Sequence, residues 1–228
     1  LVDGVNNKIV GAVDTTSLTV SSTNVAIGNS AGETSQGTES VAIGLLAGKL
    51  NQGSQTIAIG SEAGRDDQGA NGIALGHESG LADQAEFGIA IGEKAGRINQ
   101  GIRGIGIGRS SGQTNQGTKA VAIGDAAGYA TQGANAIAIG EKAGETNQAA
   151  NSIVINATGA AVENTTASSL VITPIRSAAM TTILGYNAAT GEVTHNAAIP
   201  GYISLADLKT EVAASADFAA FKGRIAAL

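Results

Sequence analysis

The stretch 40–64, SVAIGLLAGKLNQGSQTIAIGSEAG, contains almost the same block of residues twice. The block VAIG at 41–44 returns as IAIG at 57–60, and the Ala-Gly pair at 47–48 returns at 63–64. Each copy therefore begins 16 residues after the previous one. A fixed period of this kind is typical of repeat proteins, in which every repeat is one structural unit stacked on the next.

The same period continues from residue 25 to residue 156 without an insertion. The glycine that ends the first block recurs as Gly28, Gly44, Gly60, Gly76, Gly92, Gly108, Gly124 and Gly140. A glutamine recurs in the same register as Gln36, Gln52, Gln68, Gln84, Gln100, Gln116, Gln132 and Gln148. A ninth copy is degenerate, because Asn156 stands where the next glycine is expected.

The length and composition of the repeat predict a β-solenoid. Sixteen residues are too few for two packed helices, and every glycine inside a helix would cost about 1 kcal/mol. The β-branched block predicts a short strand, and the glycines around it predict corners. Each repeat is then one coil, and coils stack at the strand spacing of about 4.8 Å. The strand residues of three representative coils are Val41, Ala42 and Ile43, Ile57, Ala58 and Ile59, and Val121, Ala122 and Ile123.

The predicted strands are apolar on both faces, because Val41 and Ile43 point to one side and Ala42 to the other. Parallel strands of this kind are expected to be covered on both sides. The interior of the coil can cover one face, and a second copy of the chain is the simplest cover for the other. The sequence therefore predicts a homo-oligomer packed along this strand. The alternative is a monomeric solenoid with an exposed alanine face.

The glutamine column predicts a ladder of stacked amides that hydrogen-bond to one another along the solenoid, as amides do in cross-β assemblies. A ligand-binding role for the same column is an alternative. The residue after each glutamine is Gly in six coils and Ala85 or Ala149 in two. This column predicts a tight corner with a positive φ, where a Cβ is not tolerated.

The composition excludes several classes of function. Aromatic residues make up 3% of the 228 residues and there is no Trp, which favours a thin core. The net charge is −6 and both signs are mixed along the chain, so neither nucleic acid nor an anionic membrane is an expected partner. The chain has no Cys, and no apolar run is long enough to span a membrane. Because it begins at Leu1, we expect it to be a piece or a processed form of a longer product.

The recurring Ser-Val-Ala-Ile-Gly of 40–44, with related blocks at 89–92 and 121–124, resembles the head repeat of trimeric autotransporter adhesins. This resemblance implies three chains that wind left-handed parallel β-rolls around one axis, although the usual period of that family is shorter. A second stretch, VITPIRSAAMTTILGYNAATGEVTHN at 171–196, resembles a segment of virus and phage tail-fibre proteins. From its residues alone, this stretch predicts two strands around a turn at 188–191.

The chain is expected to have four parts. Residues 1–24 form a cap with strands at 8–13 and 17–20, and residues 25–156 form the solenoid. Residues 157–169 begin a neck that runs, with the hairpin, to residue 200. Residues 201–228 are expected to form two short amphipathic helices, or one bent helix, because Leu205, Leu208 and Val212 and then Phe218, Phe221 and Ile225 follow helical spacing.

The sequence contains no convincing motif for catalysis, phosphate binding or metal binding. GIGIGRSSG at 104–112 and GLLAGKL at 44–50 lack the helix or the spacing of a phosphate-binding loop. His77 and His195 are the only histidines and lie in no cluster of ligands. No catalytic, cofactor-binding or metal-binding residue is predicted, and the expected cofactor set is none. Phe87, Arg103 and Lys119, which share one column on successive coils, and the outward Tyr129 are candidates for a surface contact with a glycan or a protein.

The leading hypothesis is a structural fibre protein of a phage or virus, located in the virion tail fibre. It would form a stiff homotrimeric rod, contact other virion proteins and attach to a glycan or protein receptor on the host surface. The first alternative is the head of a bacterial trimeric surface adhesin at the cell surface. The second alternative, from another class, is a solenoid enzyme that acts on polysaccharide; the expectation is that the chain is not an enzyme.

Overall fold

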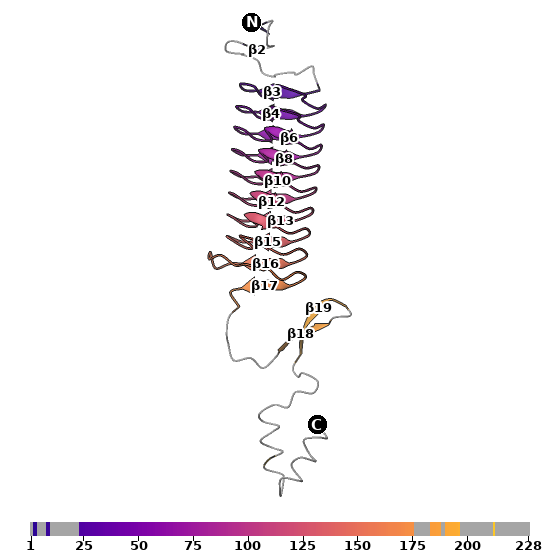
Figure 1. Cartoon of the computed structure of the whole chain (residues 1–228), viewed down its shortest axis with the longest axis vertical. Coiled ribbons are helices and arrows are strands. Elements are labelled where there is room, and N and C mark those ends of the chain that lie inside the picture. Colours follow the sequence, from indigo (N-terminus) through magenta and orange to yellow (C-terminus); the bar gives the residue numbers. More distant parts are fainter. Residues whose placement is uncertain are drawn as a thin grey trace, which may run out of the picture. The chain divides into compact units, whose positions relative to one another are not determined.

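The chain forms a parallel β-solenoid, which a computed structural model describes for residues 2–3, 8–9, 23–175, 183–187, 190–196 and 212. The chain divides into two compact units, Leu1–Ile175 and Arg176–Leu228. Within the first unit, nine coils are stacked between β3 (Val25–Ile27) and β17 (Leu170–Thr173), as Figure 1 shows. The predicted β-solenoid of 16-residue coils is thus confirmed.

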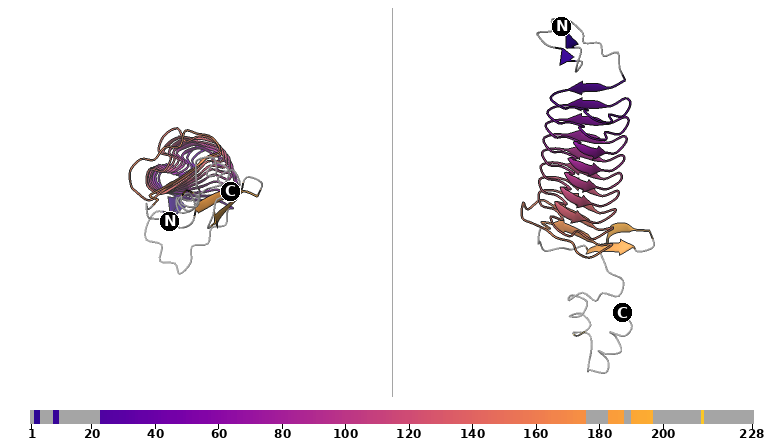
Figure 2. Two further views of the ribbon diagram at one scale, coloured as in Figure 1. Left: turned by 90° about the horizontal axis from the view of Figure 1, so that it is seen from below. Right: turned by 45° about the horizontal axis from the view of Figure 1, so that its top comes forward.

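Each coil contributes one strand to a ten-stranded parallel sheet, which we call the first sheet. Its strands are β3 (Val25–Ile27), β4 (Val41–Ile43), β5 (Ile57–Ile59), β7 (Ile73–Leu75), β9 (Ile89–Ile91), β11 (Ile105–Ile107), β13 (Val121–Ile123), β15 (Ile137–Ile139), β16 (Ile153–Asn156) and β17 (Leu170–Thr173). Paired residues are one repeat apart, as in Val41↔Ile57. Identical residue types therefore line up in columns, and successive coils lie over one another when they are seen along the stack (Figure 2).

A second parallel sheet, which the sequence did not predict, runs along another side of the coil (Figure 2). Its strands are β6 (Asp66–Gln68), β8 (Ala82–Gln84), β10 (Ile98–Gln100), β12 (Thr114–Gln116) and β14 (Ala130–Gln132). Isolated bridges extend it to Thr34 at one end and Thr146 at the other. The central residue of each strand has a positive φ, so only the outer two residues pair with the next coil. Five of the nine coils therefore have two strands rather than one.

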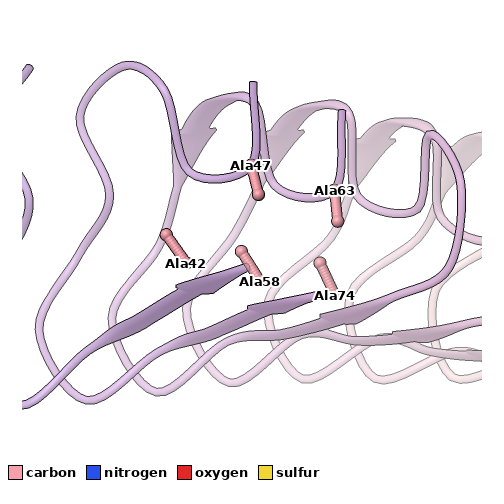
Figure 3. Packing of buried hydrophobic residues seen from close by; sticks show 5 residues of the cluster. All are labelled: Ala42, Ala47, Ala58, Ala63 and Ala74. Atoms are coloured by element: carbon pink, nitrogen blue, oxygen red, sulfur yellow. The ribbon is translucent and has the colours of Figure 1, made fainter. Parts of the chain in front are cut away.

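The core of the solenoid is made of alanine. Ala42, Ala58 and Ala74 of the first sheet point across the coil toward Ala47 and Ala63, and all five are fully buried (Figure 3). The alternative of an exposed alanine face is therefore wrong. Where the alanines face one another the interior is lined by small side chains, and the β-branched residues on either side of each alanine turn outward instead.

Glycine is required at two kinds of position. At the end of each first-sheet strand φ lies between 108° and 134°, and a Cβ on Gly92 would lie 2.6 Å from the carbonyl oxygen of Gly108 on the next coil. The glycines that follow the glutamines were expected to have a positive φ, and this is wrong. There, the next coil excludes the Cβ: on Gly101 it would lie 2.6 Å from the amide nitrogen of Thr118.

The solenoid continues beyond the expected boundary at residue 156. β16 pairs in parallel with β17, so residues 157–169 complete a ninth coil rather than beginning a neck. This coil is one residue longer than the others, as the pair Ile153↔Leu170 shows. Asn164 takes the place of the repeated glutamine, and its amide reaches the carbonyl oxygen of Ile153 at 3.4 Å. Val154 replaces the usual alanine and is packed against Val162.

Outside the solenoid, two antiparallel hairpins are described. In the second unit, β18 (Ile183–Asn187) pairs with β19 (Glu192–Asn196) around Gly191, where the sequence predicted a hairpin. Near the N-terminus, β1 (Val2–Asp3) pairs with β2 (Lys8–Ile9). The strand expected at 17–20 lies outside the described residues. So do the C-terminal helices, apart from Val212, and they stay a prediction.

Candidate functional site

The outer face of the first sheet is an apolar surface that no described part of the chain covers fully. The first and third residues of each strand point outward, and we call these two columns of Val, Ile and Leu the outer stripe. The stripe is half-exposed along its whole length; Ile57, Ile107 and Ile123, for example, are 38%, 37% and 38% exposed, whereas the alanines between them are 0% exposed. Val41, Ile43, Ile59 and Val121 belong to the same stripe and are partly buried.

The stripe has no polar interruption. Its two columns run from Val25 and Ile27 to Leu170 and Ile172, and every side chain in them is β-branched except Leu75 and Leu170. Because the strands are parallel and in register, these side chains form ridges at the strand spacing of about 4.8 Å. A contiguous apolar patch of this kind on a protein surface marks an interaction site more often than isolated surface residues do.

The glutamine column lies inside the coil, between the two sheets. From Gln52 onward each glutamine is about 2% exposed or less. The Nε2 of each donates to the Oε1 of the glutamine on the next coil, at 3.3 Å for Gln52–Gln68 and at 2.9 to 3.1 Å for the later pairs up to Gln132–Gln148. The same Nε2 also donates to a carbonyl of the first sheet, such as Ile89 for Gln100 at 2.8 Å.

This geometry assigns the column to the structure of the coil rather than to a ligand. The amides are shielded from solvent and already hold one another and the backbone. Gln36, at the first coil, is half-buried and its amide donates only to the carbonyl of Val25. The ladder of amide–amide hydrogen bonds therefore begins at Gln52 and continues to Gln148, and Gln36 is bound only to the backbone.

Ion pairs on the surface connect neighbouring columns. The Nε of Arg97 lies 2.6 Å from a carboxylate oxygen of Glu78, and this hydrogen bond lowers the pKa of Glu78 below its ordinary value. Arg65 contacts both Asp66 and Glu62, and the bond to Asp66 raises the pKa of Arg65 further. These pairs are exposed enough for solvent to weaken them.

The structure places Phe87, Arg103 and Lys119 at the same corner of three successive coils, immediately before the first-sheet strands. All three are exposed and have φ near 58°. The guanidinium carbon of Arg103 lies 5.3 Å from the centre of the Phe87 ring. Tyr129 is not part of this group, because it directly precedes β14 and so lies at another corner of the coil. The cation–π contact could not be found from the sequence, which gives only the shared column.

The remaining candidates form no chemical centre. The side chain of His77 is 49% exposed and lies 3.6 Å from Glu78, and the side chain of His195 is outside the described residues. Among the residues that the structure describes, no three His, Asp or Glu side chains are arranged to hold a metal ion. In the same part of the chain, no helix is both long and apolar enough to cross a membrane.

Comparison of the chain with protein-family models, with curated proteins and with solved structures gives no match. The resemblances to adhesin heads and to tail-fibre segments therefore rest on the quoted residues alone.

Proposed function

We propose that the chain is a structural segment of a phage or virus tail fibre, a stiff homotrimeric rod that serves attachment to a host surface. The observation that carries this proposal is the outer stripe, an unbroken apolar face along ten in-register strands. Its length is roughly 43 Å, from nine intervals at the strand spacing. Parallel sheets are almost always covered on both faces, and alanines cover only the inner face here.

A second copy of the chain is the partner that fits this face best. The ridges of the stripe repeat at the rise of the coil, and an in-register copy of the same solenoid repeats at the same rise. A partner whose side chains repeat at another spacing could match the ridges at only a few positions along the stack. A cyclic arrangement would bring one stripe from each chain to a common axis and close without leaving an exposed stripe.

The number of chains and the viral origin come from the resemblances rather than from the coil. The SVAIG block at 40–44 supports a trimer, and the segment 171–196 supports a viral fibre. The head of a bacterial surface adhesin would use the same stripe in the same way. A gene neighbourhood of virion proteins would support the fibre, and a longer product with a membrane-anchor segment would support the adhesin.

A rod function is also consistent with how the coil is held together. Two parallel sheets and the chain of buried amides run along the axis, and each bond joins one coil to the next. Bending the stack would stretch all of these ladders together on one side. A rod of this kind presents a terminal segment at a fixed distance, and several equivalent tips would gain avidity from their linkage.

Disulfide trapping tests the role of the stripe, because the chain has no Cys of its own. Ile107→Cys places one thiol in the stripe, and Ser61→Cys places one at a corner of the coil outside it. Under mild oxidation, we expect disulfide-linked dimers with Ile107→Cys and a small fraction with Ser61→Cys. Equal and low cross-linking of both variants would contradict packing through the stripe.

A further inference from the structure

The corner of the coil that holds Phe87, Arg103 and Lys119, which we call the basic column, has features that the proposed rod does not require. It lies outside the outer stripe and outside the buried core. Its residues follow one another on successive coils, so the cationic side chains start from backbone positions about 5 Å apart. Ile102, which is 42% exposed, and Thr118 lie beside them on the same coils.

Among the residues that the structure describes, the two cations of the basic column have no anionic partner. Most other cations with described side chains form ion pairs: Lys49, Arg65, Lys94, Arg97 and Arg109. Within the described part of the chain, the side chain of Arg103 makes only its contact with Phe87, and Lys119 makes no ion pair or side-chain hydrogen bond. Two like charges on adjacent coils repel each other. An anion bound between them would convert this repulsion into attraction.

The backbone conformation of the basic column is shared by the whole corner. All three residues have φ of 58° or 59°, in the left-handed region that Asn tolerates better than long or aromatic side chains do. Glu39, Gln55, Asn71, Asn135 and Asn151 occupy the same column at nearly the same φ. The conformation is therefore a property of the coil, and the case for a binding site rests on the side chains of the basic column.

We propose that the basic column binds an acidic oligosaccharide that runs along the solenoid axis. A carboxylate or sulfate group would lie between Arg103 and Lys119, because a guanidinium binds such groups through two parallel hydrogen bonds. The apolar face of a sugar ring would contact Ile102 and the edge of Phe87. The amides of Asn71 and Asn135, at the two ends of the column, supply donors and acceptors for sugar hydroxyls.

A nucleic acid is a poorer ligand for the same surface. Glu86 is exposed next to Phe87, Asp83 lies at another corner of the same coil, and Asp67 lies on the coil before it. These carboxylates would repel a continuous row of phosphates, and binding of nucleic acid needs a wider basic surface. An acidic oligosaccharide has fewer charges and exposes neutral groups between them.

The test uses fluorescently labelled heparin hexasaccharide and oligogalacturonate as acidic probes, with maltohexaose as the neutral probe, on the purified full chain at low ionic strength. The perturbed variant is Arg103→Asn/Lys119→Asn, which removes both charges and introduces the residue type that this corner favours. The matched control is Lys94→Asn/Lys142→Asn, which removes two charges from another corner with the same φ. Fluorescence anisotropy measures binding, and thermal unfolding and mass measurement are made on the same samples.

We expect the unmodified chain to bind at least one acidic probe and not maltohexaose. The basic-column variant is expected to lose at least about tenfold in affinity while its melting temperature stays equal or rises. The control is expected to stay within about twofold. Equal losses in both variants, no binding of either acidic probe, or tighter binding of a poly-glutamate peptide or a single-stranded DNA than of both sugars would overturn the proposal. A change in oligomeric state of the basic-column variant would also overturn it, because the column would then belong to a contact between chains.

Discussion

Replacing Gln100 with Met tests whether the buried amide ladder holds the coils together. Met is unbranched and similar in length, so it fills the same space without hydrogen bonds. In the native coil, the Nε2 of Gln100 donates to the carbonyls of Ile89 at 2.8 Å and Gly104 at 3.2 Å and to Gln116 at 3.0 Å. Its Oε1 accepts from Gln84 at 2.9 Å.

The expected cost follows from these contacts. The Nε2 has two hydrogens that its three acceptors must share, so with the bond that the Oε1 accepts the side chain makes about three full hydrogen bonds. Each is worth about 1 kcal/mol net, and the Oε1 of Gln116, which accepts from Gln100 alone, is left buried without a donor. Burying the apolar Met side chain offsets part of the loss. We therefore expect the free energy of unfolding to fall by about 3–5 kcal/mol.

The matched control is Gln36→Met at the first coil. Gln36 is half-buried, and its amide makes one hydrogen bond, to the carbonyl of Val25 at 3.1 Å. This substitution should cost about 1 kcal/mol. The assay is urea unfolding followed by circular dichroism, at one protein concentration for all variants because an oligomer unfolds in a concentration-dependent way. Equal losses for the two variants would refute the view that buried ladder bonds stabilise the stack.

Three further predictions concern the backbone, the core and the surface charges. Gly92→Ala should cost more than about 3 kcal/mol, because φ is 123° and the new Cβ would meet a backbone oxygen 2.6 Å away; Gly191→Ala, which meets nothing within 4 Å, should cost about 1 kcal/mol in the same urea assay. Ala90→Leu should abolish native circular dichroism or cost at least about 3 kcal/mol, because Ala90 is 0% exposed and its neighbours in the same column are Ala74 and Gly106. Retention of wild-type stability would disprove a closed alanine core. Arg97 lowers the pKa of Glu78, so this pair stabilises the fold above the ordinary carboxyl pKa and the contribution disappears as the pH falls through the lowered pKa. Glu78→Gln should therefore lower the melting temperature slightly at pH 7 and not at pH 2, and a pH-independent difference would argue against the ion pair.

The first sheet and the glutamine ladder could be predicted because each is carried by a constant column. The block from Val41 to Gly44 recurs with little change, and its β-branched residues favour extended backbone. The residues of one coil therefore predict the strand, and the 16-residue period predicts which strands pair with it. The hydrogen bond between the amides of Gln84 and Gln100 could be predicted because equivalent side chains on stacked coils are only about 4.8 Å apart.

The second sheet was missed because its strands have no local signal. Ala82–Gln84 and Ile98–Gln100, for example, share only the glutamine, and their central residues, Asp83 and Asn99, have a positive φ. Pairing with the coils on either side, rather than residue preference, makes them strands. A column of residue types that favour the left-handed region was the one signal that could have indicated this corner.

The ninth coil was missed because its sequence departs from the period at several places together. Asn156 replaces the glycine, Asn164 replaces the glutamine, and one extra residue shifts β17. The coil is still formed, and the side chain of Asn156 helps to hold it. Its Nδ2 donates to the carbonyls of Glu141 and Ala160 at 2.7 Å each, which a glycine could not do. A search for an exact period cannot detect such compensation.

The mass of the purified chain in dilute solution, measured by light scattering or mass photometry together with the stripe variant Ile107→Asp/Ile139→Asp, tests the central claim most directly. Both side chains point outward from the coil, so the variant should keep its circular dichroism. We predict three times the 22.3 kDa chain mass for the unmodified chain and the single chain mass for the variant. An unmodified chain that stays at 22.3 kDa with native circular dichroism would contradict the account.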